Sequence, residues 1–367
     1  MNLHLIAGAR PNFLKISSIC NSIFKWNKKN QKINFNLIHT GQHFDSNLSK
    51  IFFDELNIPT PDTNFNCGGG SRISQISKIM ISYEKYLIKN SVPDFLVVVG
   101  DVNSTIACSI VAKSFNVKLV HVEAGIRSFD NEMPEEINRT LTDSITDYSF
   151  VTSETAINNL INEGFDKKNI FFVGNTMVDT LLQNIVKFKK PNFYDYHNLK
   201  NQKYFVLTLH RPSNVDNANK LDELLSFFNN NLNEYKVIFP IHPRTKKNIK
   251  LDKKYDNIIY NDPLGYLEFN YLVKNSFAVI TDSGGITEET TIMGIPCMTL
   301  RDNTERPETI NCGTNVLLGT DVNNFNKYFQ LLFNNKWKKG KIPIKWDGKT
   351  GDRIVNVLFD IYKKSIT

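Results

Sequence analysis

Two carboxylates come directly after two successive apolar runs in the first half of the sequence. Asp101 follows the run Phe95–Val99, and Glu123 follows the run Lys118–Val122. If these runs are neighbouring parallel strands, their carboxyl ends meet at one sheet edge, and both acids face one crevice. Glu135 is a third acid close behind them. Carboxylates that share a crevice repel each other, which raises the pKa of at least one, so the cluster predicts proton transfer.

Arg139 lies one helical turn after Glu135 in the segment Pro134–Arg139. Proline suits the first turn of a helix, and this spacing puts Glu135 and Arg139 on one helix face. Taken alone, the spacing is typical of a simple helix salt bridge. The nearby acids favour a functional role for the pair.

The second half of the sequence places two histidines at the ends of apolar runs. His210 is followed by Arg211, and His242 is followed two residues later by Arg244. A lone histidine is usually structural, but two histidines that each accompany an arginine favour a phosphate-binding or acid–base role. Neither has the spacing of a metal-binding histidine pair.

The segment Ser283-Gly284-Gly285 follows another apolar run and begins a helical pattern. The free N–H groups at such a helix start can bind a phosphate. Glu289, one turn further on, can accept hydrogen bonds from ribose hydroxyls, and Arg306 adds a cation nearby. No G-x-G-x-x-G follows a strand, so the fingerprint of a nicotinamide or flavin site is absent.

The first strand-to-helix turn, Gly8-Ala9-Arg10-Pro11, carries further positive charge. Glycine permits a tight turn, and Arg10 and Lys15 offer charge suited to a pyrophosphate. The alternative is an ordinary loop with solvated cations.

The elements that must position these residues are short apolar runs separated by helical patterns. Runs of this length, rich in Val, Ile and Leu, are typical of buried parallel strands joined by crossover helices, such as a helix over 105–115. The expected fold is α/β, with two Rossmann-like doubly wound domains. The predicted strands are Leu3–Ala7, Asn36–His39, Phe95–Val99, Lys118–Val122, Tyr148–Thr152, Ile170–Val173, Tyr204–Leu209, Lys236–Ile241, Ile258–Tyr260 and Ala278–Thr281.

Length and composition agree with two domains. The chain has 367 residues, and a domain typically takes ~150. We expect an N-terminal domain over 1–173 that holds the acids and a C-terminal domain over 174–367. The net charge of +7 suits an anionic small molecule as well as a nucleic acid. The basic stretch Lys336–Lys341 is short and indicates a solvated loop, so no nucleic-acid partner is expected.

Several classes of protein are excluded by pattern. No run approaches the ~20 apolar residues of a membrane span, and the N-terminus lacks a basic region of a signal peptide. The five cysteines contain no C-x-x-C pair, so they indicate a reduced, cytoplasmic protein with neither a zinc site nor a disulfide framework.

Together these motifs resemble the non-hydrolysing UDP-N-acetylglucosamine 2-epimerase family, within the GT-B-type superfamily. The resemblance runs from Leu3 to about Val357. It is carried by Gly8–Pro11, Thr40–His43, Gly100-Asp101, His121–Ser128, Pro134–Arg139, Gly174–Thr176, His210-Arg211, Asp282–Glu289 and Glu305–Glu308.

The resemblance implies an isomerase that interconverts UDP-GlcNAc and UDP-ManNAc for surface polysaccharide precursors, in a cleft between the domains. UDP is lost by anti elimination to a 2-acetamidoglucal and then re-added, without a redox cofactor or metal. The matching catalytic positions are Asp101, Glu123, Glu135, Arg139 and His210. The matching UDP-sugar positions are Arg10, Lys15, His242, Ser283, Gly284, Gly285, Glu289 and Arg306. The family also implies a homodimer and a last helix, about 350–367, that packs on the N-terminal domain.

Departures from the family pattern leave the sugar open. Ala9 and Asn12 stand where common bacterial members have Thr and Glu, and Phe44-Asp45 replaces a polar pair through which some members bind an activating UDP-GlcNAc. The Gly-Ala-Arg-Pro turn also occurs in relatives that act on UDP-2,3-diacetamido-glucuronic acid. The alternatives are therefore a modified UDP-HexNAc substrate, a hydrolysing 2-epimerase, a GT-B glycosyltransferase and a non-catalytic sugar-nucleotide sensor.

Overall fold

A computed structural model describes the chain except residues 43–52, 54, 57, 233, 250–254 and 367. It divides into two compact units. Unit 1 comprises Met1–Gln183 and Ile344–Thr367, and unit 2 comprises Asn184–Pro343. Residues 174–183 thus belong to the first unit, whereas the sequence placed them in the second domain. Residues 344–367 also belong to the first unit, and they include the last helix, which was expected to pack on the N-terminal domain.

Unit 1 is built on a parallel sheet with the order β3-β2-β1-β4-β5-β6-β7 among the described residues. Its strands are β1 (Asn2–Ala7), β2 (Asn34–His39), β3 (Thr63–Asn64), β4 (Phe95–Val99), β5 (Lys118–Val122), β6 (Tyr148–Val151) and β7 (Ile170–Phe172). Its helices are α1 (Arg10–Asn27), α3 (Arg72–Lys89), α4 (Asn103–Ser114), α5 (Pro134–Ile145), α6 (Glu154–Asn162), η1 (Lys167–Asn169), α7 (Thr176–Asn184, ending at the unit boundary) and α16 (Thr350–Ile366).

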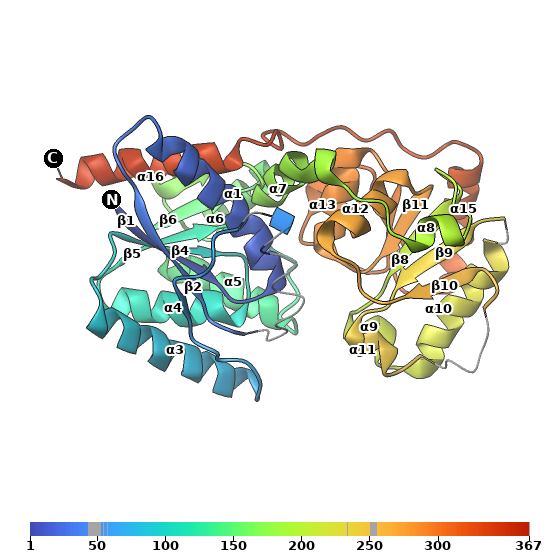
Figure 1. Cartoon of the computed structure of the whole chain (residues 1–367), viewed down its shortest axis with the longest axis horizontal. Helices are drawn as coiled ribbons and strands as arrows, with labels where there is room; N and C mark the ends of the chain where they lie inside the picture. The colour runs from blue at the N-terminus through green and yellow to red at the C-terminus, as the bar shows by residue number, and fades with distance from the viewer. Residues whose placement is uncertain (43–52, 54, 57, 233, 250–254, 367) are drawn as a thin grey trace. The chain divides into compact units, whose positions relative to one another are not determined.

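Buried hydrogen bonds explain why α7 and α16 belong to unit 1. The carboxylate Oδ2 of Asp179, on α7, accepts hydrogen bonds from Ser18 Oγ of α1 and from Gly351 N of α16, both at 2.8 Å. Thr180 Oγ1 also donates to the carbonyl of Leu14 at 2.6 Å. A buried carboxylate requires such partners, so α7 and α16 are tied to α1, beside which α16 lies in Figure 1.

Unit 2 repeats the architecture with the order β10-β9-β8-β11-β12-β13 among the described residues. Its strands are β8 (Tyr204–Thr208), β9 (Lys236–Pro240), β10 (Ile258–Asn261), β11 (Ala278–Thr281), β12 (Cys297–Thr299) and β13 (Asn315–Leu317). Its helices are η2 (Ile185–Lys187), α8 (Phe193–Tyr196), α9 (Pro212–Val215), α10 (Ala218–Asn231), α11 (Pro243–Lys246), α12 (Tyr266–Asn275), α13 (Gly284–Met293), α14 (Pro307–Asn311), η3 (Val322–Asn324) and α15 (Asn326–Phe333).

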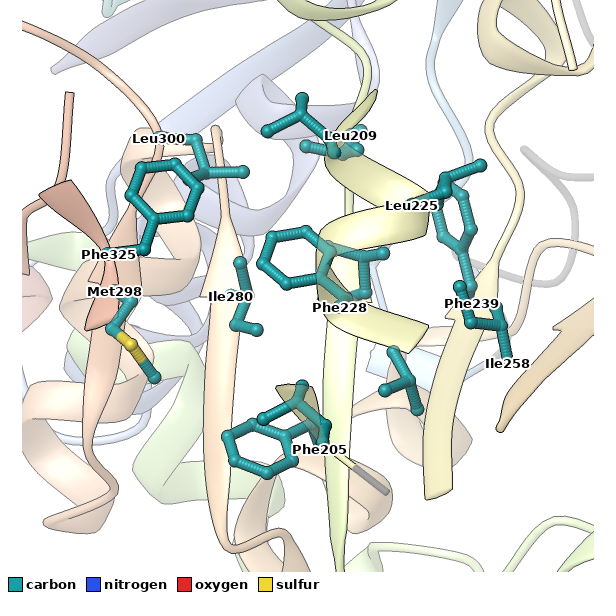
Figure 2. Packing of buried hydrophobic residues seen from close by; sticks show 14 of the residues in the cluster. Phe205, Leu209, Leu225, Phe228, Phe239, Ile258, Ile280, Met298, Leu300 and Phe325 are labelled. Atoms are coloured by element: carbon teal, nitrogen blue, oxygen red, sulfur yellow. The ribbon is translucent and has the colours of Figure 1, made fainter. Parts of the chain in front are cut away.

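A buried aromatic and aliphatic cluster holds α10 on the sheet of unit 2. Figure 2 shows Leu225 and Phe228 of α10 packed with Phe205 of β8 and Ile280 of β11. A second cluster, which includes Tyr204, Val206 and Val279, covers the other face of the same strands. Burial on both faces explains their continuous apolar sequences. The prediction of two doubly wound α/β folds is confirmed.

Each sheet reverses its strand order at one place. The reversal lies between β1 and β4 in unit 1 and between β8 and β11 in unit 2. In open parallel sheets, ligands bind beyond the carboxyl ends of the strands at such a switch point. The turns after β1, β4, β8 and β11 are therefore the places to look for a site.

Candidate functional site

Asn12 joins the two turns at the switch point of unit 1. Its Oδ1 accepts hydrogen bonds from the N–H groups of Gly8 and Ala9 at 3.2 and 3.0 Å, and its Nδ2 donates to the carbonyl of Val99 at 2.9 Å. One buried side chain thus caps α1 and fixes the end of β4. Arg10 is the first residue of α1, and its side chain lies outside the described atoms, as do residues His43 to Asp45.

Lys15 and Glu123 form a buried ion pair with Nζ–Oε2 at 2.6 Å, and their side chains are 10% and 2% exposed. Glu123 has φ +71° in the left-handed region, which is uncommon for a residue with a side chain. Gly100 lies against the pair, because a Cβ at this position would be 2.8 Å from Lys15 Nζ. The predicted pyrophosphate ligand Lys15 therefore contacts a predicted catalytic acid.

Arg139 is the cation beside Asp101. Its Nη2 donates a hydrogen bond to Asp101 Oδ2, and the guanidinium is almost completely buried while the carboxylate is 29% exposed. Asn138 supports the same residue by donating from Nδ2 to the Asp101 carbonyl at 2.8 Å. The structure thus brings Asp101 and Arg139 together, and each of the two strand-end acids has its own cationic partner.

The helix ion pair of Arg139 involves Glu136 and not Glu135. Arg139 Nη1 donates to Glu136 Oε2 at 2.5 Å, and the buried Glu136 also accepts the N–H groups of Ser128 and Phe129 at 2.9 and 3.0 Å. Glu135 is exposed on the neighbouring helix position. These bonds turn Glu136 inward, so Glu136 anchors the 127–129 loop to α5.

A buried charge network lies behind Gly100. His121 Nε2 is 2.8 Å from the Gly100 carbonyl, and His121 Nδ1 is 2.6 Å from Asp143 Oδ1. Arg127 donates from Nη1 to Asp143 at 2.7 Å and from Nε and Nη2 to both oxygens of Glu163 at 2.7 and 2.6 Å. Burial opposes ionisation of Asp143, but the charges and hydrogen bonds of His121 and Arg127 hold its pKa below the ordinary value.

His210 and Asp282 form a pair at the switch point of unit 2. His210 Nδ1 is 2.8 Å from Asp282 Oδ1, and the buried carboxylate also accepts the N–H groups of His210 and Arg211 at 3.0 and 2.9 Å. Burial works against the charge of Asp282, yet these hydrogen bonds lower its pKa. An ionised Asp282 fixes Nδ1 as the donor, so the His210 ring, 39% exposed, keeps Nε2 for chemistry.

His242 lies beside His210, with ring centroids 5.6 Å apart. It is the N-cap of α11, where its Nδ1 accepts the N–H of Arg244 at 3.2 Å. The two strand-end histidines are thus brought together. An open hollow of about 510 Å³ beside them is lined by Asp216, His242, Pro243, Arg244, Lys247 and Asn248.

Helix α13 begins at Gly284, directly after Ser283, and Gly285 completes its first positions. Glu305 reaches this helix start, because its Oε1 would be 3.1 Å from a Cβ on Gly284, and its Oε2 pairs with Arg301 Nη2 at 2.7 Å. The Glu305 carboxylate lies beside the N-terminus of α13 and beside the Arg301 guanidinium. This turn therefore accommodates an anion.

Glu289 and Arg306 are both buried within unit 2. Arg306 Nε donates to Oε1 of Glu288, the residue before Glu289 on α13. Asn270 Nδ2 lies 3.5 Å from Glu289 Oε1. Burial and the charge of Glu289 raise the pKa of Tyr266 well above its ordinary value. The structure therefore places Glu289 and Arg306 near the first turns of α13, each among internal partners.

Sequence reasoning missed three carboxylates that hold this arrangement, namely Glu136, Asp143 and Asp282. Asp282 follows strand β11 as Asp101 follows β4, so its position was a usable signal. Glu136 and Asp143 are ordinary acids on a polar-looking helix. Their only signal is that they fall on the buried face of α5 with Arg139.

Comparison with known proteins agrees with these features. The family model for UDP-N-acetylglucosamine 2-epimerase matches residues 25–359. A Methanocaldococcus jannaschii UDP-N-acetylglucosamine 2-epimerase is 44% identical, over 98% of this chain and 99% of its own. A Pseudomonas aeruginosa UDP-2,3-diacetamido-2,3-dideoxy-D-glucuronate 2-epimerase is 40% identical, over 87% of this chain and 88% of its own.

Solved structures give the same result. The crystal structure of the Methanocaldococcus jannaschii enzyme in complex with UDP-GlcNAc and UDP superposes with a TM-score of 0.88 at 44% identity. The match covers 98% of this chain and 99% of that one, so the expected GT-B-type pair of Rossmann-like folds is confirmed. The chain belongs to the UDP-N-acetylglucosamine 2-epimerase family, whose members are isomerases of nucleotide sugars.

Proposed function

We propose that the chain is a non-hydrolysing 2-epimerase that interconverts UDP-GlcNAc and UDP-ManNAc. The observation that carries the proposal is the pair of strand-end acids in unit 1, Asp101 and Glu123, each held by a buried cation. A family match over most of the chain supports the same activity. Epimerisation at C2 needs removal of a proton on one face and its return on the other, and two fixed carboxylates suit this task.

The reaction is proposed to run by elimination and re-addition. A carboxylate removes the C2 proton while the bond between C1 and the diphosphate oxygen breaks, which gives 2-acetamidoglucal and UDP. UDP then re-adds at C1 as a proton returns to the opposite face of C2. We assign the proton transfers to the acids Asp101, Glu123 and Glu135, with Arg139 and His210 supporting them.

We assign the departing UDP to unit 2 and to the first turn of unit 1. Diphosphate carries away negative charge, so N–H groups at a helix start and cations stabilise it as it leaves. The proposed ligands are Arg10, Lys15, His242, Ser283, Gly284, Gly285, Glu289 and Arg306. Because Lys15 also pairs with Glu123, it links charge on the nucleotide to the position of an acid.

Incubation with UDP-GlcNAc in D2O, followed by proton NMR, tests the proposal. We expect deuterium at C2 and intact UDP-ManNAc. Asp101→Asn and Glu123→Gln should each abolish exchange and keep UDP binding, whereas Asp94→Asn should be active, since Asp94 lies at the opposite end of β4 and accepts the Asn2 N–H. Wild-type exchange in either acid variant removes that residue from the mechanism.

A second substrate has specific support. The relative that is 40% identical is named for UDP-2,3-diacetamido-2,3-dideoxy-D-glucuronate, so the same NMR assay should be run on that sugar. Exchange with only the diacetamido uronate identifies the modified sugar as substrate. Release of free ManNAc identifies a hydrolase, and transfer of the sugar to an acceptor without C2 exchange identifies a glycosyltransferase.

We further propose a homodimer that works in the cytoplasm and supplies surface polysaccharide synthesis. Three isoleucines of α3, Ile73, Ile81 and Ile88, are 71%, 51% and 69% exposed and recur at near-heptad spacing on one face, which favours a second copy as partner. Light scattering of wild type and Ile81→Lys tests the dimer.

No helix among the described residues has the length and apolar character to cross a membrane. Loss of ManNAc from cell-surface glycan on gene deletion tests the proposed role in polysaccharide synthesis.

A further inference from the structure

The buried His121 lies at the centre of unit 1, between the turns that carry the two strand-end acids. Its side chain is completely buried, as is that of Asp143. His121 lies on β5, two residues before Glu123, and its Nε2 contacts the Gly100 carbonyl just before Asp101. It therefore contacts the backbone of the Asp101 turn directly and reaches the Glu123 turn through Asp143, which accepts from Gly125 N.

The partners of His121 determine where its protons are. The carbonyl of Gly100 can only accept, so Nε2 at 2.8 Å must carry a proton. At Nδ1, 2.6 Å from Asp143 Oδ1, two lone pairs cannot face each other, so a proton lies between them. Oδ2 of the same carboxylate accepts from Arg127 Nη1 and Gly125 N at 2.7 and 3.0 Å, which favours the ionised acid. The proton therefore belongs to the ring.

We propose that His121 is a positioning residue, which fixes the turns of Asp101 and Glu123 relative to each other through Gly100 and Asp143. Gly100 has φ +66°, and its N–H donates to the Val122 carbonyl at 3.0 Å. Its carbonyl contacts His121, so both backbone polar groups of Gly100 are held, and we call this arrangement the clamp. Asp143 holds the other turn through Gly125 N. The importance of this clamp for turnover depends on the proposed function, but the protonation of His121 does not.

NMR of the wild-type protein labelled with 15N-histidine tests the protonation directly. We expect both ring nitrogens of His121 to carry protons at neutral pH, because each faces an acceptor. His4 is an internal control, because burial lowers its pKa to about 4 and its ring is neutral at this pH. The His121→Gln variant assigns the signals. A His121 ring nitrogen without a proton at neutral pH overturns the inference, whether or not the protein is an epimerase.

Two matched variants test positioning. Gln reaches the position of Nε2 and can still donate to Gly100, while Asn reaches only that of Nδ1 and can still donate to Asp143. We expect His121→Asn to lower kcat about 100-fold with KM nearly unchanged, since a displacement of ~1 Å has that effect, and His121→Gln to keep at least about a tenth of kcat. Equal losses of kcat in both variants, with parallel losses of thermal stability and UDP binding, would show a merely structural role. A wild-type kcat in His121→Asn would also refute the positioning role.

Discussion

Replacement of Lys15 by methionine should destabilise unit 1 strongly, because it leaves the Glu123 carboxylate buried beside a hydrophobic side chain. The two side chains are 10% and 2% exposed and their charged atoms are 2.6 Å apart. Removal of one partner of such a pair costs about 3–5 kcal/mol, mainly through the charge left behind. With a urea m-value of about 1–3 kcal/mol/M, the unfolding midpoint should fall by at least about 1 M. The double variant with Glu123→Gln should recover most of this loss.

Tryptophan fluorescence during urea unfolding can report this unit alone. Trp337 belongs to unit 2, while Trp26 and Trp346 belong to unit 1, so a Trp337→Phe background removes the other signal. Lys25→Met is the matched control on the same helix, since its pair with Asp352 at 2.5 Å has side chains 71% and 35% exposed. Exposed pairs contribute about 0–1 kcal/mol. Equal midpoint shifts for the two lysine variants, or no recovery in the double variant, would refute the reasoning.

Three further outcomes are expected. Gly100→Ala should lower both stability and kcat, because φ is +66° and the new methyl would lie 2.8 Å from the buried ammonium of Lys15. The control is Gly164→Ala, at φ +90° with open space around it, which should show in urea unfolding only the ~1–2 kcal/mol backbone cost. Burial lowers the pKa of His4 from 6.5 to about 4, so on acidification the unfolded state binds a proton at this residue before the folded state does. The free energy of unfolding of unit 1 should therefore fall by up to about 3 kcal/mol as the pH falls from 6.5 to 4. His4→Gln should remove this dependence from unfolding curves measured at different pH. Asp282→Asn should lower kcat about 100-fold by releasing the His210 ring, and steady-state kinetics with kcat within about twofold of wild type would contradict that role.

Local pattern was sufficient for most strands of both sheets. Phe95–Val99, Lys118–Val122 and Ala278–Thr281 are strands with the predicted ends, since parallel strands buried on both faces are continuous apolar runs. The short strands β3 and β13 were missed. They have two and three residues, too few to show a period, and tertiary pairing with a neighbouring strand creates them.

The strand-end acids were found for the same reason, because a strand end is visible in the sequence. Their partners were not, since contacts between α5 and the sheet depend on how the helix is rotated. Spacing alone allowed Arg139 to pair with Glu135, but the N–H groups of the 127–129 loop bind Glu136 and turn that acid inward. The role of Asp143 could not be predicted either, because it also depends on the rotation of α5. In the structure Asp143 is hydrogen-bonded to His121 and Arg127.

The discontinuity of unit 1 has a consequence for biosynthesis. Its last element, α16, buries Ile354, Val355, Leu358 and Phe359, and Trp346 just before it is 1% exposed. The ribosome makes these residues last, after all of unit 2. Nascent domains fold as units when their chain is complete, so unit 2 should reach its native state first, while the earlier-made helix α1 lacks the partner that packs against it. A nonsense codon shortly before Thr350 should therefore damage the half of the protein that was translated first.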